Sequence, residues 1–273
     1  MHTPVFLDHR SIISVSGADA ANYMNNIVTV STLDMEPGAF RYGALLTPQG
    51  KIIADMLVAR DGDALLLDCA SSAAPALIKR LTLMKLRAAV TIAERPDLGV
   101  TAFEGSPDPR SADAPRRLIV KRQAPADTSA YHAARIAAGL PEQDFDFGAD
   151  EVFPADINMD LDAGVDFRKG CFVGQEVVSR MKRRGTARRR TLKVSVAGDV
   201  AVPAPILANG FEIGMLTSIS GGVGLARVRI DRLAEAQAKG ETITAGDAAV
   251  TFDNPPWLAG ELAAMAEAKE AKT

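Results

Sequence analysis

The stretch Asp166-Phe167-Arg168-Lys169-Gly170-Cys171-Phe172-Val173-Gly174-Gln175-Glu176 is the most informative part of this 273-residue sequence. Its cysteine follows two cations and a glycine, and a second glycine, an amide and a carboxylate come after it. Nearby cations stabilise a thiolate, and a helix that begins near Gly174 would add the positive end of its dipole. We therefore predict that Cys171 is a reactive thiol, with Lys169 as a second catalytic residue.

A run of basic residues follows the cysteine. The net charge of the chain is −3, so this basic character is local. Such a run is usually a solvated helix face, although it could also bind phosphate or RNA. Because it has no interleaved aromatic residues, base stacking is unsupported and nucleic-acid binding is not expected. The run consists of Arg180, Lys182, Arg183, Arg184, Arg188, Arg189 and Arg190.

Composition argues against several classes of site. The chain is 47% hydrophobic and 24% charged, as in ordinary globular proteins. Two cysteines, Cys69 and Cys171, give no disulfide framework and cannot supply the four thiolates of an iron–sulfur cluster. The three histidines lack the spacing of metal ligands, so no metal site is predicted. Without a membrane-length apolar run or the features of a signal peptide, a cytoplasmic location away from membranes is expected.

The first 190 residues or so alternate between short strands and helices, which predicts an α+β body. Turns at Gly50 and Gly62 join three of the strands into an expected antiparallel meander. Cys69 ends an apolar strand and is expected to be buried. The expected strands cover residues 11–15, 40–47, 52–59, 64–68, 90–93, 99–103 and 118–120, and the expected helices 18–28, 72–88, 129–138 and 174–184.

The sequence changes character after residue 190. Short apolar segments separated by Gly, Pro and Asn predict a small β-barrel over residues 191–256. The remaining residues, 257–273, are rich in Ala, Glu and Lys and are expected to form a frayed helix or flexible tail.

The segment Lys169–Glu176 resembles the signature of the YgfZ-type folate-binding proteins, which are related to the T-protein (aminomethyltransferase) of the glycine cleavage system. The similarity continues upstream through Phe153-Pro154-Ala155-Asp156-Ile157-Asn158 and downstream through Arg184-Gly185. A weaker N-terminal match consists of Pro37-Gly38, Tyr42 and Gly50-Lys51. The resemblance implies an α+β fold of three domains around a central folate cavity. The implied domains are residues 1–48 plus 117–190, residues 49–116, and the barrel of residues 191–256.

The resemblance also implies contacts to tetrahydrofolate or a derivative. T-proteins hold the pterin with a Pro-x-Glu segment, and Asp156 stands at the matching place with one methylene less. A carboxylate can accept hydrogen bonds from the exocyclic amine and the neighbouring ring N–H of a pterin. The alternative for Asp156 is an Asx turn after proline. The other candidate contacts are Asn158, Gln175, Glu176, Arg183 and Arg184, of which Gln175 and Glu176 could equally serve only to cap a helix.

One departure from the T-proteins bears on activity. The stretch Cys69–Ala76 has no carboxylate where T-proteins carry the key acid for folate chemistry, and proton transfer needs a positioned acid or base. The glycine cleavage reaction is therefore not expected. The resemblance implies a folate-binding accessory protein for iron–sulfur cluster assembly or repair. Its expected partners are folate and iron–sulfur proteins or their assembly machinery. A tetrahydrofolate-dependent one-carbon transferase and an RNA-binding module are the alternatives.

Overall fold

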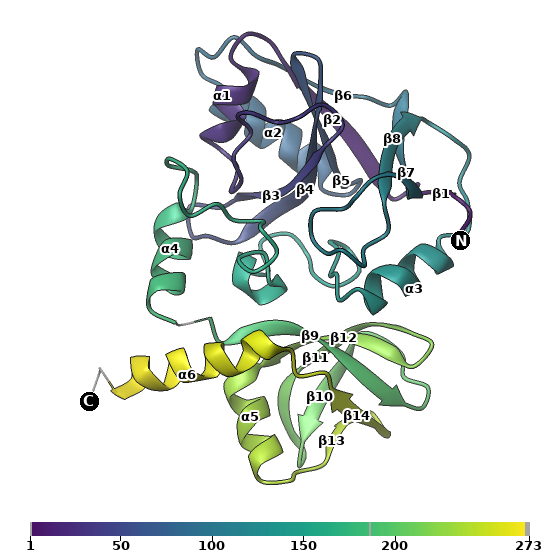
Figure 1. Ribbon diagram of the computed structural model, residues 1–273, viewed down its shortest axis with the longest axis vertical. Coiled ribbons are helices and arrows are strands. Elements are labelled where there is room, and N and C mark those ends of the chain that lie inside the picture. Colours follow the sequence, from purple (N-terminus) through teal and green to yellow (C-terminus); the bar gives the residue numbers. More distant parts are fainter. Residues whose placement is uncertain (1, 186, 271–273) are drawn as a thin grey trace.

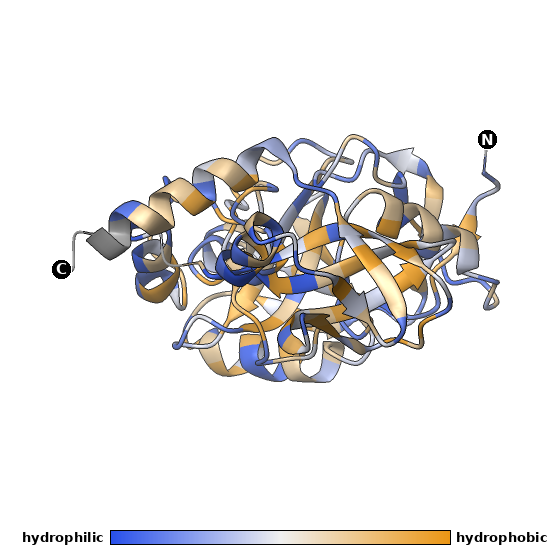
Figure 2. Ribbon diagram, turned by 90° about the horizontal axis from the view of Figure 1, so that it is seen from below, coloured by the Kyte–Doolittle hydropathy of each residue, from blue (hydrophilic) through white to orange (hydrophobic). Residues whose placement is uncertain are grey.

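The computed structural model describes residues 2–185 and 187–270. An α+β body that contains two antiparallel sheets lies above a closed C-terminal β-barrel, and the chain crosses between them once after helix α4 (Gln175–Arg183) (Figure 1). Strand residues are mostly hydrophobic, whereas the connecting loops are mostly hydrophilic (Figure 2). None of the described helices is long and apolar enough to cross a membrane.

A five-stranded sheet forms the centre of the body, in the order β3-β4-β5-β2-β6. The antiparallel pairing of β3 with β4 and of β4 with β5 confirms the expected meander. Both faces of β4 are covered, by helices α1 (Ala20–Asn25) and α2 (Ala74–Met84) on one side and by the segment around the thiol loop on the other. The strands are β2 (Arg10–Ser16), β3 (Phe40–Leu46), β4 (Ile52–Asp61), β5 (Ala64–Ala70) and β6 (Thr91–Glu94).

A smaller sheet packs beside the first, with strand order β1-β7-β8. Its strands are β1 (Val5–Phe6), β7 (Leu98–Ser106) and β8 (Arg117–Lys121). Tyr131 of helix α3 (Ser129–Ala137) is buried against this sheet together with Leu7 and Val100.

The two sheets do not divide where the domain boundaries were expected. The boundary between residues 48 and 49 falls in the turn between β3 and β4, which are paired along their lengths. The boundary between residues 116 and 117 separates β7 from β8, which are also paired. Strands joined by a short turn share a hydrogen-bond ladder, so each sheet contains segments that were assigned to different domains.

The expected C-terminal barrel is confirmed. Six strands close in the order β10-β11-β12-β9-β14-β13, around a core that includes Leu192, Val194, Leu216 and Val228. Helix α5 (Ile230–Ala238) follows β12 and buries Leu233 against the same core. The strands are β9 (Arg189–Ala197), β10 (Ala204–Ala208), β11 (Phe211–Ser220), β12 (Val223–Arg229), β13 (Ile243–Ala245) and β14 (Ala248–Phe252).

The C-terminal segment, expected to be a frayed helix or flexible tail, is a helix packed on the barrel. Helix α6 (Pro256–Glu270) buries Leu258 in the barrel core and packs Trp257, Leu262 and Met265 against it. Glu261 accepts a hydrogen bond from Arg190 at 2.7 Å. A few anchoring side chains within an Ala-rich segment fix this helix, and composition alone does not reveal them. Residues 271–273 of the expected tail lie outside the described part of the chain.

Candidate functional site

The candidate thiol lies on the surface of the body. Cys171 is exposed, while its neighbour Phe172 is buried in the core cluster beside β3 and β4. The other cysteine, Cys69, is fully buried in β5, and burial raises the pKa of its thiol to about 12. The burial expected for Cys69 is therefore confirmed, and Cys171 is the accessible thiol.

Hydrogen bonds hold the loop that precedes Cys171. One carboxylate oxygen of Asp166 accepts from the backbone N–H groups of Arg168 and Lys169, at 2.9 and 3.2 Å. The backbone N–H of Asp166 donates to the carbonyl of Thr29 at 2.9 Å. The loop therefore has a fixed path rather than a free one.

Lys169 anchors this loop to the end of helix α1. Its ammonium donates to the carbonyls of Asn25, Val28 and Val30, at 2.6 Å for Val28 and 3.3 Å for Val30. Burial lowers the pKa of Lys169 to about 8, although the nearby Asp166 opposes that shift. The three donors of an ammonium match these three acceptors. This geometry gives Lys169 a positioning role in the thiol loop, and its expected catalytic role stays a prediction.

Two glycines allow the β3–β4 turn to pack against the start of α4. Gly174 has a φ of +79°, and a Cβ there would lie 2.7 Å from the carbonyl oxygen of Thr47. Gly50 has a φ of +82°, and its Cβ would lie 3.1 Å from Cβ of Val177. Side chains at either position would be both strained and crowded. The turn and the helix therefore fix the C-terminal side of the thiol loop.

Asp156 and Asn158 lie where the body meets the barrel. The Asp156 carboxylate accepts from the backbone N–H of Phe153 at 2.9 Å, and burial raises its pKa against the opposing effects of this hydrogen bond and nearby cations. Asn158 Nδ2 donates to the carbonyl of Thr191 at 2.7 Å, and the Thr191 hydroxyl donates to the carbonyl of Asp156 at 2.9 Å. These bonds join the short helix Pro154–Ile157 to strand β9.

A cavity of about 180 Å³, which we call the interdomain cavity, lies beside Asn158. Arg110, Asp162 and Trp257 also line it. The Oδ1 atom of Asn158 is buried and has no hydrogen-bond partner within the described residues. Burial raises the pKa of Asp162 to about 7, although Arg110 opposes the shift. The residues that line the cavity thus include an amide side chain, a carboxyl group with a raised pKa and an aromatic ring.

Asp156 lines a different cavity, which we call the polar pocket. It has a volume of about 270 Å³, and Arg189, Glu212 and Arg227 also line it. The two residues expected to contact one pterin therefore lie on neighbouring cavities at the same junction.

A third hollow of about 770 Å³ lies beside the thiol loop and is lined by Tyr42, Val165, Phe167 and Arg168. Pro109 and Ala163 line this groove, while the adjacent Arg110 and Asp162 line the interdomain cavity. The segments at residues 109–110 and 162–163 therefore lie between the groove beside the thiol loop and the interdomain cavity at the junction with the barrel.

The remaining candidate contacts lie on α4, and none of them lines these three hollows. Gln175 is half-buried at the start of the helix, and Glu176 is exposed in its first turn. Arg183 and Arg184 are exposed at its other end. The structure therefore does not bring these four residues together with Asp156 and Asn158, and their contact with folate stays a prediction.

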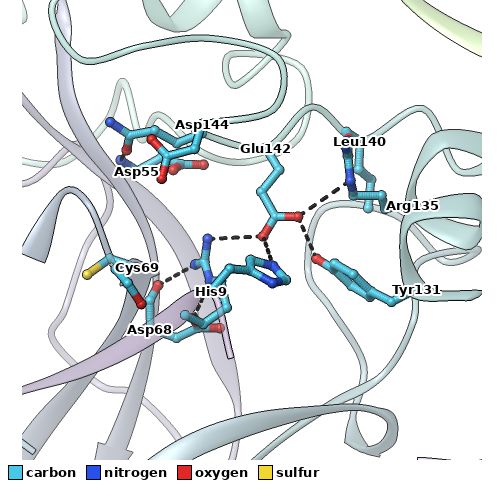
Figure 3. A network of polar contacts seen from close by, with 12 residues as sticks. His9, Asp55, Asp68, Cys69, Tyr131, Arg135, Leu140, Glu142 and Asp144 are labelled. Atoms are coloured by element: carbon cyan, nitrogen blue, oxygen red, sulfur yellow. Dashed lines mark hydrogen bonds and ion pairs between the residues drawn. The ribbon is translucent and has the colours of Figure 1, made fainter. Parts of the chain in front are cut away.

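A buried polar network ties the two sheets to α3. Arg10 pairs with Asp68 at 2.6 Å and with Glu142 at 3.2 Å, and Glu142 also accepts from Tyr131 at 3.0 Å (Figure 3). Arg117 pairs with the second oxygen of Asp68 at 2.9 Å. Because each charge has its partners, loss of one member would leave the others buried and unpaired.

Asp55, on strand β4 beside this network, was not identified from the sequence. Its Oδ2 accepts from the Tyr42 hydroxyl at 3.0 Å, while Oδ1 is buried without a hydrogen-bond partner in the described part of the chain. Burial raises the pKa of Asp55, although Arg10 and Arg110 oppose the shift. An aspartate within the apolar run Ile52–Leu57 is the signal that would have found it.

The comparisons with known proteins match both ends of the chain. Residues 7–105 match the GCVT N-terminal domain, and residues 188–260 match the CAF17 C-terminal beta-barrel domain. Among solved structures, the glycine cleavage system aminomethyltransferase T from Bartonella henselae superposes with a TM-score of 0.75. That likeness covers 93% of this chain and 85% of the other, at 16% identity, and shows the fold.

Curated relatives carry the name of iron–sulfur cluster assembly factor IBA57, mitochondrial, or its homologue. The one from Phaeosphaeria nodorum is 28% identical over 83% of this chain and 70% of its own length. The mouse protein is 29% identical over 83% of this chain and 77% of its own length. The human protein is 28% identical over 81% of this chain and 75% of its own length.

These names bear on two expectations. The relatives are called IBA57, so the comparisons support the expected likeness to T-proteins, while the narrower YgfZ assignment stays a prediction. Each is named as mitochondrial, which overturns the expected cytoplasmic location. The fold of this chain is therefore that of the T-proteins, and its two ends match the GCVT N-terminal domain and the CAF17 C-terminal β-barrel domain.

Proposed function

We propose that this protein is an iron–sulfur cluster assembly factor that binds a reduced folate and acts through the exposed thiol of Cys171. The observation that carries the proposal is the accessible cysteine on a loop fixed at both ends, by Lys169 before it and by Phe172 and Gly174 after it. Relatives named as iron–sulfur cluster assembly factors support the same role.

The thiol chemistry implies a partner protein. Clusters of two or four irons are commonly held by four cysteine thiolates, and this chain has one accessible cysteine. Cys171 would contribute at most one ligand to a cluster in transfer, and the remaining ligands would come from the protein that delivers or receives it. A fixed loop suits such a step, because a preorganised ligand loses little conformational freedom when it binds.

Residues at the junction between body and barrel support the folate part of the proposal. The exocyclic amine and ring N–H groups of a pterin are donors, and Asn158, whose buried Oδ1 has no hydrogen-bond partner among the described residues, is one of the residues that line the interdomain cavity. Trp257 offers an aromatic face in the same cavity, and Asp156 offers a buried carboxylate in the polar pocket. These residues would hold and orient the ligand. A reduced folate would supply one-carbon or redox chemistry when bound.

Complementation tests the thiol role. In a host strain that lacks its own relative, wild-type protein should restore the activities of iron–sulfur enzymes, and Cys171→Ser should not. The buried Cys69→Ala is the matched control and should restore them. Glycine cleavage, measured in parallel, should not depend on the protein. Full rescue by Cys171→Ser would remove the thiol from the proposal, and normal iron–sulfur enzymes in the deletion strain would refute the assembly role.

A folate-dependent one-carbon transferase is the second candidate, because of Asp55. This buried carboxyl group has a raised pKa and an oxygen without a hydrogen-bond partner among the described residues, which suits a proton-transfer residue. If the protein is a transferase, purified protein supplied with tetrahydrofolate and an aminomethyl donor should form methylenetetrahydrofolate, and Asp55→Asn should abolish that turnover. Absence of turnover in the wild-type protein would exclude this candidate.

A further inference from the structure

Helix α4 presents three arginines on one exposed face. Arg180, Arg183 and Arg184 follow the i, i+3, i+4 spacing that places side chains on the same side of a helix. All three are exposed, and Val178, which points to the opposite side, is buried in the core cluster beside β3 and β4. We call these three residues the arginine face.

The arginines of this face form no ion pairs with carboxylates among the described residues. Arg183 donates only to the backbone carbonyl of Ser179, at 3.4 Å. Two other cations of the basic run are paired, since Lys182 lies 3.2 Å from Asp160 and Arg190 lies 2.5 Å from it. Like charges at these spacings repel by a few tenths of a kcal/mol per pair, which the helix dipole partly offsets.

The arginine face is held in a fixed position relative to the thiol. Helix α4 begins four residues after Cys171, and the close contact between Gly174 and the β3–β4 turn fixes its start. At about 1.5 Å per residue, Arg180 lies roughly 9 Å along the helix from Gly174. A protein interface covers about 800 Å² on each side, which is wide enough to include both the arginine face and Cys171.

We propose that the arginine face docks an acidic iron–sulfur protein and aligns it with Cys171. This inference rests on the proposed function and names the chemistry of the partner. Carboxylates on the partner would relieve the repulsion among the arginines and steer its approach. A folate tail is less suited to this face, because Arg183 and Arg184 line none of the three hollows described above. RNA is less suited because α4 has no aromatic residue for stacking.

Binding of a plant-type [2Fe–2S] ferredoxin, used as an acidic iron–sulfur probe, tests the proposal. Wild-type protein should bind it at low salt, and affinity should fall at least tenfold between about 20 and 200 mM salt. The triple variant Arg180→Glu, Arg183→Glu, Arg184→Glu should lose at least tenfold in affinity at low salt, whereas the corresponding triple lysine variant should retain it. Absence of salt-dependent binding, or an unchanged affinity in the glutamate variant, would overturn the proposal.

A matched charge reversal controls for the general field of the protein. Arg116, Lys121 and Arg122 are exposed at strand β8, which lies on the other side of the body from α4 (Figure 1). Their change to glutamate should leave ferredoxin affinity within about twofold of wild type. An equal loss in this control would mean that net charge, and not the arginine face, governs binding, which would also overturn the proposal.

The same variants separate this inference from the proposed function. Cys171→Ser should bind the ferredoxin normally while failing in complementation, because it removes the thiol and keeps the arginine face. If Cys171→Ser fully restores the iron–sulfur enzymes in complementation, the thiol role is refuted. The ferredoxin affinities then still decide whether the arginine face docks an acidic partner. If the glutamate variant instead loses preference for polyglutamylated folate, or loses RNA in a gel shift, with ferredoxin affinity unchanged, the docking proposal is wrong.

Discussion

At the scale of single residues, backbone position decides what each side chain can do. The chain has two cysteines, one fully buried in β5 and one exposed beside a buried phenylalanine. The sequence motif around Cys171 and the apolar strand before Cys69 were sufficient to predict this difference. Asp55 was missed although an acid within an apolar run is itself a signal. The Tyr42 hydroxyl that donates to its carboxylate lies on the paired strand β3, and Gln143, which accepts from its backbone N–H, comes from a distant segment.

Limited alkylation should label Cys171 well before Cys69. Iodoacetamide reacts with thiolates, and the raised pKa of about 12 keeps Cys69 protonated at neutral pH as well as inaccessible. Mass spectrometry after a short reaction with native protein should find carbamidomethylation at Cys171. Both cysteines should react in denaturant, which serves as the control. Comparable labelling of Cys69 in the native protein would contradict the burial seen here.

Stability should depend on pH through Asp162. Its folded pKa of about 7 lies above the ordinary value of 3.8, so between these values the folded state binds more protons than the unfolded state. The contribution of Asp162 is fully present below about pH 4 and is lost as pH rises towards 7. The free energy of unfolding, measured in urea at several pH values, should show this fall in wild type relative to Asp162→Asn. If the free energies of unfolding of the two proteins differ by the same amount at every pH in this range, the raised pKa of Asp162 is refuted.

At the scale of elements, close packing at glycines fixes the thiol loop. The sequence showed glycines at positions 50, 170 and 174 without showing which of them the packing requires. In the structure, Gly50 and Gly174 meet at the contact between the β3–β4 turn and α4, while a Cβ on Gly170 would meet nothing within 4 Å. Such a contact joins segments more than 120 positions apart, so no local pattern could reveal it.

Gly174→Ala should destabilise the protein, and Gly170→Ala should not. The alanine at position 174 would have a positive φ and a Cβ 2.7 Å from the Thr47 carbonyl oxygen, and a cost of about 1–3 kcal/mol is expected for such strain. Urea unfolding of the two variants measures the difference. Faster alkylation of Cys171 in Gly174→Ala would show in addition that the loop has loosened. Equal stability of the two variants would mean that the turn and the helix relax around the added methyl group.

At the scale of the whole molecule, the boundary of the barrel near residue 190 was predictable because short strands and turn residues replace the longer elements there. The domain split within the body came from the family resemblance, and it is crossed by the pairing of β3 with β4, which the sequence itself had predicted, and by the pairing of β7 with β8. The packing of α6 depended on Trp257, Leu258 and Glu261, whose partners lie in the barrel and at Arg190. What the sequence could not supply was contact between distant segments.

The last prediction concerns the junction between the body and the barrel. If a reduced folate binds there and contacts Asp156, then Asp156→Asn should lower its affinity for tetrahydrofolate at least tenfold, because the carboxylate charge is lost in a buried pocket. The asparagine keeps an oxygen that can accept from Phe153, so the fold should be preserved. Calorimetric titration gives the affinities.

Glu212→Gln, in the same pocket, is the control for general charge and should bind tetrahydrofolate normally. An equal loss in both variants would assign the effect to the field of the pocket rather than to Asp156. Absence of binding to wild-type protein would reject the folate proposal itself, while the thiol role of Cys171 would still rest on complementation.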